Sequence, residues 1–131
     1  MNLYAVFAHQ INEVWEKVLP LVNSSLEYAD GKWTAESIKT ALENKQMQLF
    51  IVGKDVTAIA ITQVQQYPAK KVLVVMFCAG SGMNDWVSLM SEFEDWAKEQ
   101  DCKAVEVIGR PGWERVLGWE RIHVVVRKTL T

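Results

Sequence analysis

The chain has 131 residues, half of them hydrophobic and six of them tryptophan, which predicts a single domain over residues 1–131 with a core of its own. Fourteen basic and sixteen acidic residues give a formal net charge of −2, and no basic block indicates a nucleic-acid groove. No apolar run approaches the ~20 residues of a membrane span, and the first residues lack the pattern of a signal peptide, so we expect a cytoplasmic protein.

The first third of the chain is predicted to be mainly helical. Residues 3–8 are either a short first strand or an irregular segment that leads into the first helix. Residues 9–22 carry apolar side chains at helical spacing, and Pro20 is expected to bend or stop this helix. Thr34 is a residue type that caps helices, which predicts a second helix over residues 35–43.

Three strands with short links are predicted next. Residues 48–52 and 56–64 flank the turn Gly53-Lys54-Asp55, which is typical of a hairpin. Residues 72–78 form an apolar run rich in β-branched side chains, as in a buried strand. These three strands are therefore expected to be antiparallel neighbours.

A glycine-bearing turn, residues 79–82, joins the apolar run to a long amphipathic helix, residues 83–98. Free backbone N–H groups at such a strand-to-helix junction can hold an anion or a phosphate. Asn84 and Asp85 are equally good as plain helix caps, and the Asp85 carboxylate would repel a phosphate group placed close to it.

The last third of the chain predicts a strand over residues 104–108, a break at 109–112, a short helix at 113–117 and a final strand at 122–127. The long helix then crosses between two strands that should run parallel. The whole order predicts an α/β fold, with a mixed, mostly antiparallel central sheet and helices on both faces.

The two cysteines, Cys78 and Cys102, are interpreted as reduced and mostly buried thiols. A cysteine pair needs further ligands to hold zinc, and both histidines are distant in sequence. No metal site is predicted.

This element order resembles that of the GNAT (Gcn5-related N-acetyltransferase) superfamily over nearly the whole chain. Short segments resemble, more narrowly, small GNAT-like proteins of tailed bacteriophages and prophages; they are Gln48-Leu49-Phe50, Ile61-Thr62-Gln63, Trp96-Ala97 and the run from Gly109 to Leu117. The resemblance implies an acyl-CoA-dependent N-acyltransferase that binds acetyl-CoA and an amine acceptor. Because most members of that phage group lack an assigned activity, the alternative is a non-catalytic, virion-associated or binding protein that holds a phage or host protein.

The resemblance also implies where the cofactor would bind. In GNAT enzymes the fourth strand splays from the fifth, its backbone pairs with the pantetheine arm, and a glycine-rich loop wraps the pyrophosphate. By position, the strand residues are Met76, Phe77 and Cys78, and the loop residues are Gly80, Ser81, Gly82, Met83 and Asn84.

Acetyl transfer needs a base for the amine and an acid for the leaving thiolate, which in GNAT enzymes is often a tyrosine after the fifth strand. No tyrosine follows that strand here. Glu106 is a candidate base or a surface residue of an alternating strand, and Tyr67 is a candidate or a turn aromatic. The other candidate binding residues are Arg110, Trp113 and Arg115. Arg110 suits either anion recognition or a structural pair with Glu114 or Trp113.

Overall fold

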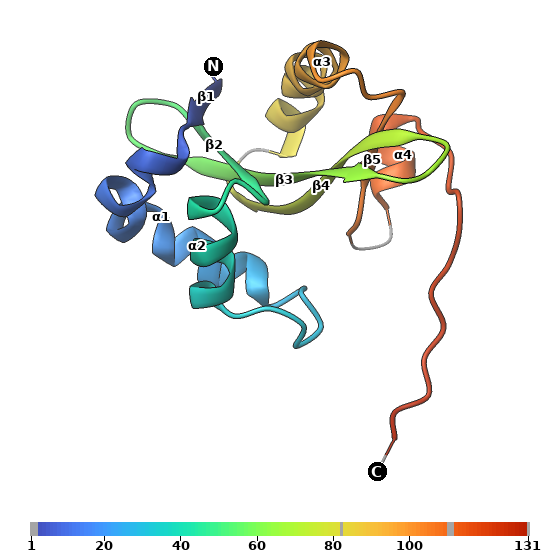
Figure 1. Ribbon diagram of the computed structural model, residues 1–131, viewed down its shortest axis with the longest axis horizontal. Helices are drawn as coiled ribbons and strands as arrows, with labels where there is room; N and C mark the ends of the chain where they lie inside the picture. Colours follow the sequence, from blue (N-terminus) through green and yellow to red (C-terminus); the bar gives the residue numbers. More distant parts are fainter. Residues whose placement is uncertain (1–2, 82, 110–111, 131) are drawn as a thin grey trace.

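The computed structural model describes residues 3–81, 83–109 and 112–130, which form one five-stranded sheet with helices on both faces (Figure 1). The strands, in their order across the sheet, are β1 (Leu3–Val6), β2 (Gln48–Val52), β3 (Ala58–Gln66), β4 (Lys71–Gly80) and β5 (Ala104–Val107). The helices are α1 (Ile11–Leu26), preceded by the 3-10 turn Ala8–Gln10, α2 (Ala35–Glu43), α3 (Met83–Glu99) and α4 (Trp113–Leu117).

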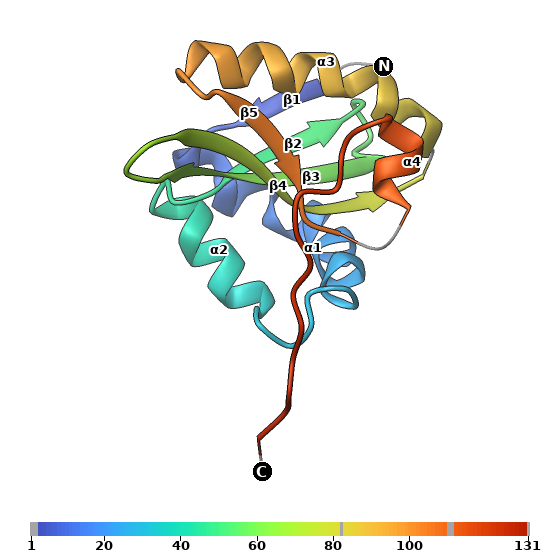
Figure 2. The same cartoon turned by 90° about the vertical axis from the view of Figure 1, so that its right-hand side faces the viewer.

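The pairing of the strands confirms the predicted α/β class and the mixed sheet. β1, β2, β3 and β4 are antiparallel neighbours, and β5 alone runs parallel to its neighbour β4. Tight turns can join only antiparallel strands, whereas α3 provides the crossover that a parallel pair requires. Helices α1 and α2 cover one face of the sheet, and α3 and α4 lie on the other (Figures 1 and 2).

Pro20 lies inside α1 and does not end it, because the helix continues to Leu26. A proline in a helix interior costs about 3 kcal/mol. Val18 and Val22 flank it on the buried side, and neither is exposed at all. Burying each valine stabilises the fold by roughly 1.5–3 kcal/mol, which together offsets the cost of the proline.

The predicted cap of α2 is confirmed, and the structure completes it. Thr34 Oγ1 accepts a hydrogen bond from the Ser37 backbone N–H at 3.0 Å, and Ser37 Oγ accepts one from the Thr34 N–H at 2.9 Å. This reciprocal pair satisfies two N–H groups that a helix start otherwise leaves without partners.

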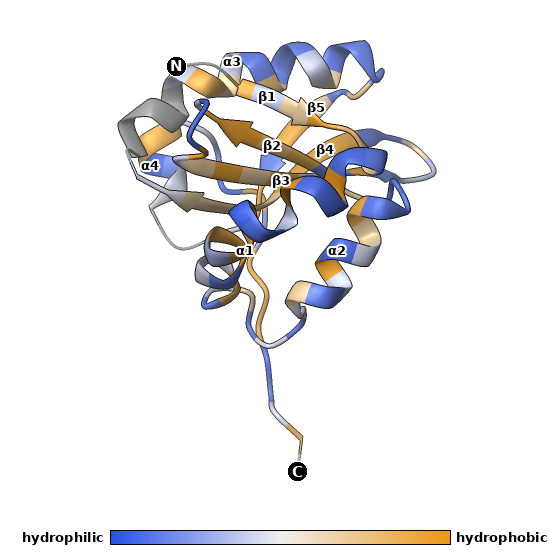
Figure 3. Cartoon of the chain, turned by 90° about the vertical axis from the view of Figure 1, so that its left-hand side faces the viewer, coloured by the Kyte–Doolittle hydropathy of each residue, from blue (hydrophilic) through white to orange (hydrophobic). Residues whose placement is uncertain are grey.

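The second half of the core lies between the sheet and α3. Phe93 of α3 is fully buried and meets Phe50 of β2 edge to face, with ring centroids 5.3 Å apart and planes at 89°. Trp96 makes a similar contact with Phe50 at 5.7 Å. Figure 3 shows the same division by hydropathy. The strands of the sheet are largely hydrophobic, whereas α3 carries hydrophilic residues on the side away from the sheet.

The predicted final strand, residues 122–127, is wrong for the chain as it folds here. Residues 119–130 follow α4 as an extended segment without regular secondary structure, and they run away from the sheet (Figures 1 and 2). The β-branched pattern is real, but a strand forms only where a neighbouring strand accepts its backbone hydrogen bonds. Among the described residues, none lies beside this segment.

Candidate active site

The strands β4 and β5 separate in the middle of the sheet. Their parallel register ends where Val75 lies opposite Val107, and β5 stops there. The Ile108 N–H still donates to the Val75 carbonyl at 3.2 Å. β4 continues to Gly80, and over that length only β3 pairs with it among the described residues. The other edge of β4 is therefore open from Met76 onward.

A β-bulge lies at the same point of β4. Phe77 is opposite Ile61 and Val75 is opposite Thr62, which leaves Met76 without a partner on β3. A bulge bends its strand and redirects the side chains that follow. In agreement, the consecutive residues Met76 and Phe77 both pack against the core under α1 and α2. The bend thus coincides with the end of β4–β5 pairing.

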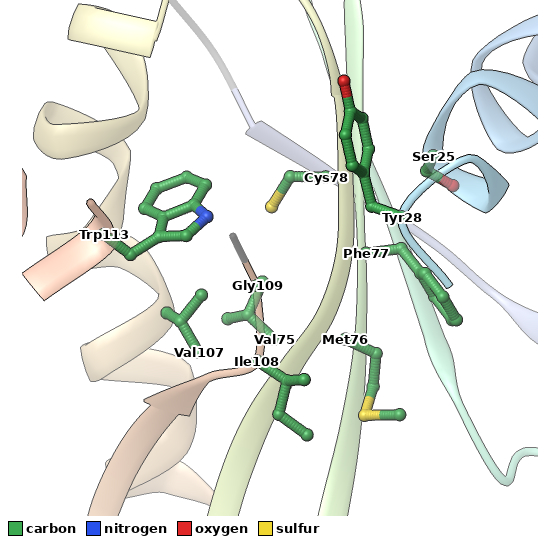
Figure 4. A pocket seen from close by; sticks show the side chains of 10 residues that line it. All are labelled: Ser25, Tyr28, Val75, Met76, Phe77, Cys78, Val107, Ile108, Gly109 and Trp113. Atoms are coloured by element: carbon green, nitrogen blue, oxygen red, sulfur yellow. The ribbon is translucent and has the colours of Figure 1, made fainter. Parts of the chain in front are cut away.

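A small cavity of about 50 Å³ occupies this opening (Figure 4). Four separate parts of the chain build its wall, so it exists only in the folded protein. They are β4 (Val75, Met76, Phe77, Cys78), the end of β5 and the residues after it (Val107, Ile108, Gly109), the C-terminal end of α1 with the following turn (Ser25, Tyr28), and α4 (Trp113).

All three strand residues that the resemblance singled out, Met76, Phe77 and Cys78, line this cavity. Cys78 is half-buried, and desolvation raises the pKa of its thiol to about 12. A thiol with such a pKa is neutral at physiological pH and therefore serves as an apolar wall rather than a nucleophile.

This burial predicts a specific dependence of stability on pH. The Cys78 thiol ionises near its ordinary pKa of 9.0 when unfolded and only near 12 when folded. Its contribution is complete below pH 9 and is lost as the pH rises from 9 toward 12, at ~1.4 kcal/mol per pH unit. Urea denaturation of the wild type and of Cys78→Ala, at pH 8.5 and 10.5, should show a loss about 2 kcal/mol larger in the wild type. Equal losses would contradict this assignment.

The turn after β4 is held by structural contacts of its own. Gly80 has a φ of +128°, and a Cβ there would lie 2.4 Å from the Ala58 Cβ, so this glycine lets β4 approach β3 closely. The Ser81 N–H donates to the Thr57 carbonyl at 3.4 Å. Gly82 and the side chains of Met83 and Asn84 lie outside the described residues. The phosphate-binding role of this turn stays a prediction.

The two candidate catalytic residues lie in different places. Tyr67 is in the β3–β4 turn, where its N–H donates to the Lys70 carbonyl at 2.8 Å. It precedes β4, whereas the cavity starts roughly 13 Å along that strand, and Tyr67 is not among the lining residues. Glu106 lies next to the cavity in sequence, one residue before Val107. Because Val107 packs on the α3 side, alternation points Glu106 to the α1 side.

Of the three other candidate binding residues, only Trp113 is placed at the cavity. Its indole packs so closely against Gly109 that a Cβ on Gly109 would lie 2.6 Å from Nε1. Arg115 is exposed on α4 and does not line the cavity, and Arg110 lies outside the described residues. Glu114 pairs with Arg121, and this hydrogen bond holds the pKa of Glu114 below its usual value.

The cavity residues that the sequence did not single out include two with hydroxyl groups, Ser25 and Tyr28. Ser25 is buried, and its Oγ donates to the Val22 carbonyl at 2.8 Å. Tyr28 follows α1 and shows a 58% exposed side chain. In Figure 4 the Tyr28 ring and the Trp113 indole lie on either side of Cys78. Nothing in the local pattern indicated this, because Tyr28 and β4 are about fifty positions apart.

A second hollow lies on the same face of the sheet as α2. This groove is open and measures about 420 Å³, and Trp33, Glu36 and Gln63 are among its lining residues. The Trp33 ring meets the Phe77 ring edge to face, with centroids 6.2 Å apart. Phe77 also lines the cavity, so one aromatic pair separates the groove from the opening between β4 and β5.

Across residues 3–81, 83–109 and 112–130, no group of three or more His, Cys, Asp or Glu side chains is arranged to hold a metal ion. The same residues include no helix with the length and apolarity needed to span a bilayer.

The strand order, the parallel β4–β5 pair that parts at a bulge, and the crossover helix α3 define the GNAT acetyltransferase fold. Sequence comparison adds nothing to this, since neither a protein-family model nor a curated protein matches the chain.

Solved structures show the likeness over essentially the whole chain. A ribosomal-protein-alanine N-acetyltransferase from Brucella melitensis biovar Abortus 2308 has a TM-score of 0.66 at 12% identity, covering 98% of this chain and 100% of the other. The aminoglycoside acetyltransferase meta-AAC0020 from an uncultured soil metagenomic sample, in complex with sisomicin, gives 0.68 at 13% identity, covering 99% and 96%. Aminoglycoside N-acetyltransferase AAC(6')-Iy in complex with CoA gives 0.64 at 14% identity, covering 99% of each chain.

Proposed function

We propose that this protein is an N-acyltransferase that takes its acyl group from acyl-CoA, with acetyl-CoA as the donor. The observation that carries the proposal is the opening between β4 and β5, where a bulge at Met76 coincides with the end of strand pairing. The pantetheine arm of acyl-CoA is extended, contains amides and ends in a thioester. An open strand edge can pair with its amides, and an apolar cavity beside that edge can hold its thioester end.

The described residues fit the thioester end of this cofactor. Backbone groups of β4 after Val75 are free to pair with the amides of the pantetheine arm, and Cys78, Val107 and Trp113 provide an apolar wall. The bound cofactor would supply an activated acyl carbonyl with a thiolate leaving group. At the start of α3, backbone N–H groups of the first helical turn are expected to face the pyrophosphate. Ser81 adds no such donor, because its N–H already bonds Thr57.

Tyr28 is the group we propose as the acid for the leaving sulfur. It is the one tyrosine among the lining residues of the cavity, and no tyrosine follows β5 in the sequence. A tyrosine hydroxyl is a hydrogen-bond donor and can give its proton to a developing thiolate. Glu106 is the proposed base, acting on the acceptor amine from the α1 side of the sheet.

The acceptor is proposed to be a cationic amine that enters over the groove beside Trp33. An indole face and the nearby Glu36 carboxylate are groups that attract a protonated amine. The sisomicin complex of the structurally similar aminoglycoside acetyltransferase supports amine-bearing small molecules as the first class to test.

Acetyl-CoA binding is expected to be saturable and visible in tryptophan fluorescence, because Trp113 lines the cavity. Cys78→Met should weaken binding at least about tenfold, since a longer side chain enters a cavity of about 50 Å³ and a tenfold loss corresponds to ~1.4 kcal/mol. Isothermal titration calorimetry with acetyl-CoA provides the dissociation constants.

The matched control for this binding test is Cys102→Ala. Cys102 is buried in the core under α3 and does not line the cavity, so its loss should leave acetyl-CoA affinity unchanged. Absence of binding to the wild type at millimolar acetyl-CoA would overturn the proposed function.

Tyr28→Phe is expected to lower kcat about 100-fold while acetyl-CoA affinity stays within twofold, because only the proton donor is removed. The assay follows the release of the free CoA thiol across a panel of primary amines, aminoglycosides included. Tyr67→Phe is the control at the far end of β4 and should keep full activity. Equal kcat values for Tyr28→Phe and the wild type would remove Tyr28 from the mechanism.

A second candidate function is a non-catalytic protein that uses this fold to hold a partner. The observation in its favour is the turn after β4, where Gly80 packs against Ala58 at the start of β3 and the Ser81 N–H bonds the carbonyl of Thr57 just before it. The binding experiment separates the two functions, because this candidate expects no acetyl-CoA affinity. An origin in a tailed bacteriophage or prophage, and a place in the virion, stay predictions from the sequence.

A further inference from the structure

The groove beside α2 carries polar side chains that no other described residue uses. Its walls are α2, the residues that follow this helix, and β3, and its volume of about 420 Å³ is in the range of small-molecule sites. Among the described residues, the Gln46 amide, the Thr40 hydroxyl and the Glu36 carboxylate have no side-chain partner. These donors and acceptors are therefore available to a ligand.

The sequence of α2 directs four of its side chains toward this groove. Glu36 and Thr40 are four positions apart, and so are Ser37 and Ala41, which places all four on neighbouring positions of one helix face. Helix α2 is long enough for this face to extend about 13 Å. The groove therefore offers polar groups spread over the length of a ring-sized ligand and not at a single point.

Gln63 reaches the groove from β3 and is already oriented. Its Oε1 accepts a hydrogen bond from the Gln65 Nε2 at 2.6 Å, whereas its own Nε2 has no partner among the described residues. The bond to Gln65 fixes the direction in which the free Nε2 can donate. A side chain that is held before binding loses less conformational entropy when a ligand arrives.

Trp33 is the one aromatic side chain among the described residues that line the groove. Its indole is half-buried, and its edge-to-face contact with Phe77, at a centroid distance of 6.2 Å, holds it in place. An indole offers a broad apolar face. A sugar ring presents C–H groups on its faces and hydroxyls around its rim, so it can stack on an indole while amides and hydroxyls bond its rim.

The charge of the groove disfavours two other classes of ligand. Glu36 is the only charged side chain among the described lining residues. A phosphate or another polyanion would find no cation there and would be repelled by the carboxylate. A polyamine would find a single carboxylate for several positive charges. A neutral, hydroxyl-rich ligand matches the lining better than either.

We propose that the groove beside α2 binds a saccharide, with one sugar ring stacked on Trp33 and its hydroxyls bonded to Gln46, Gln63 and Thr40. Binding depends on the neutral ring, and an amine is not required for it. Where the saccharide carries a protonated amine, Glu36 pairs with that amine. Only in this last respect does the inference rest on the proposed function, whose acceptor is then an amino sugar.

The first test measures saccharide binding in the absence of any acyl donor, by saturation-transfer NMR and isothermal titration calorimetry. The probes are maltotriose, the β-1,4-linked glucosamine trisaccharide and its fully N-acetylated form, with spermidine as an amine that has no ring. The wild type is expected to bind at least one of the two neutral trisaccharides, and spermidine is not expected to displace it. Absence of binding by all three trisaccharides at millimolar concentrations, or displacement by spermidine, would overturn the proposal.

The second test places the saccharide in the groove. Trp33→Ala should weaken binding at least about tenfold, and Gln46→Ala about three- to tenfold, as expected for one lost hydrogen bond. Gln46 is exposed, so its variant stays informative if Trp33→Ala disturbs the contact with Phe77. Gln66→Ala is the matched control, because Gln66 is exposed on β3 and does not line the groove. Glu36→Gln should weaken only the amine-bearing trisaccharide.

These results are independent of the acetyl-CoA titration. Saccharide binding that is unchanged in both Trp33→Ala and Gln46→Ala would place the ligand elsewhere and overturn the proposal. Saccharide binding that responds to both substitutions, in a protein without affinity for acetyl-CoA, would support the groove and contradict only the acyltransferase function. Circular dichroism of each variant verifies that it is folded.

Discussion

Replacing Phe93 by alanine is expected to lower the free energy of unfolding by about 3–5 kcal/mol, the cost of deleting a large buried aromatic side chain. Phe93 is fully buried, and its ring meets that of Phe50 edge to face at 5.3 Å. The alanine leaves a cavity between α3 and the sheet and removes this aromatic contact. Guanidinium denaturation followed by circular dichroism measures the loss.

Phe7→Ala is the matched control for Phe93, with the same chemical change at a 62% exposed position. Its ring stacks on His9 at 5.9 Å, and its loss should cost less than about 1 kcal/mol. Similar losses for both variants would show that α3 does not dock on the sheet as described. Because α3 begins at the proposed pyrophosphate site, Phe93→Ala should also weaken acetyl-CoA binding.

Gly80→Ala is the second substitution with a large expected effect, a loss of about 3 kcal/mol or more. Two costs add at this position. The φ of +128° is a conformation that residues with a Cβ rarely adopt, at a cost of about 1–3 kcal/mol. A Cβ would also lie 2.4 Å from the Ala58 Cβ and 2.5 Å from the Thr57 carbonyl oxygen, and such overpacking costs a further 1–3 kcal/mol.

Gly31→Ala separates these two costs. Gly31 has a φ of +71°, but nothing lies within 4 Å of the place that its Cβ would take. This variant should therefore carry the conformational cost alone, about 1–2 kcal/mol. Thermal and urea denaturation of both variants provide the comparison. If Gly80→Ala lowers the free energy of unfolding no more than Gly31→Ala does, β4 does not approach β3 as closely at this turn as described.

Local pattern predicted most of the secondary structure of this protein. The β-branched run that ends at Cys78 forms most of β4, Thr34 caps α2, and the amphipathic stretch over residues 83–98 forms α3. Each of these follows from chain neighbours within about one turn or one hairpin, which is the range over which periodicity and capping act. Pro20 does not stop α1, for a tertiary reason: the free-energy cost of the proline is offset by burial that only packing provides.

Of the residues that the sequence singled out, Met76, Phe77 and Cys78 of β4 and Trp113 of α4 line the cavity. Their role in binding a cofactor stays a prediction. Tyr28 could not be predicted, because only the tertiary structure brings the turn after α1 beside β4, at a sequence separation of about fifty residues. The bulge could not be predicted either. It exists because Met76 has no partner on β3, and that depends on the register in which β3 and β4 pair.

The sequence by itself determined most of the helices and strands, since 3.6- and 2-residue periods and caps are local properties. Only the tertiary structure decided where β4 leaves β5, which side chains surround that opening, and that residues 122–127 stay unpaired in one chain. The physical reason is the same in each case. A strand's register, its edge and the cavity beside it are relations between distant segments, and their free energy is gained only when those segments pack together.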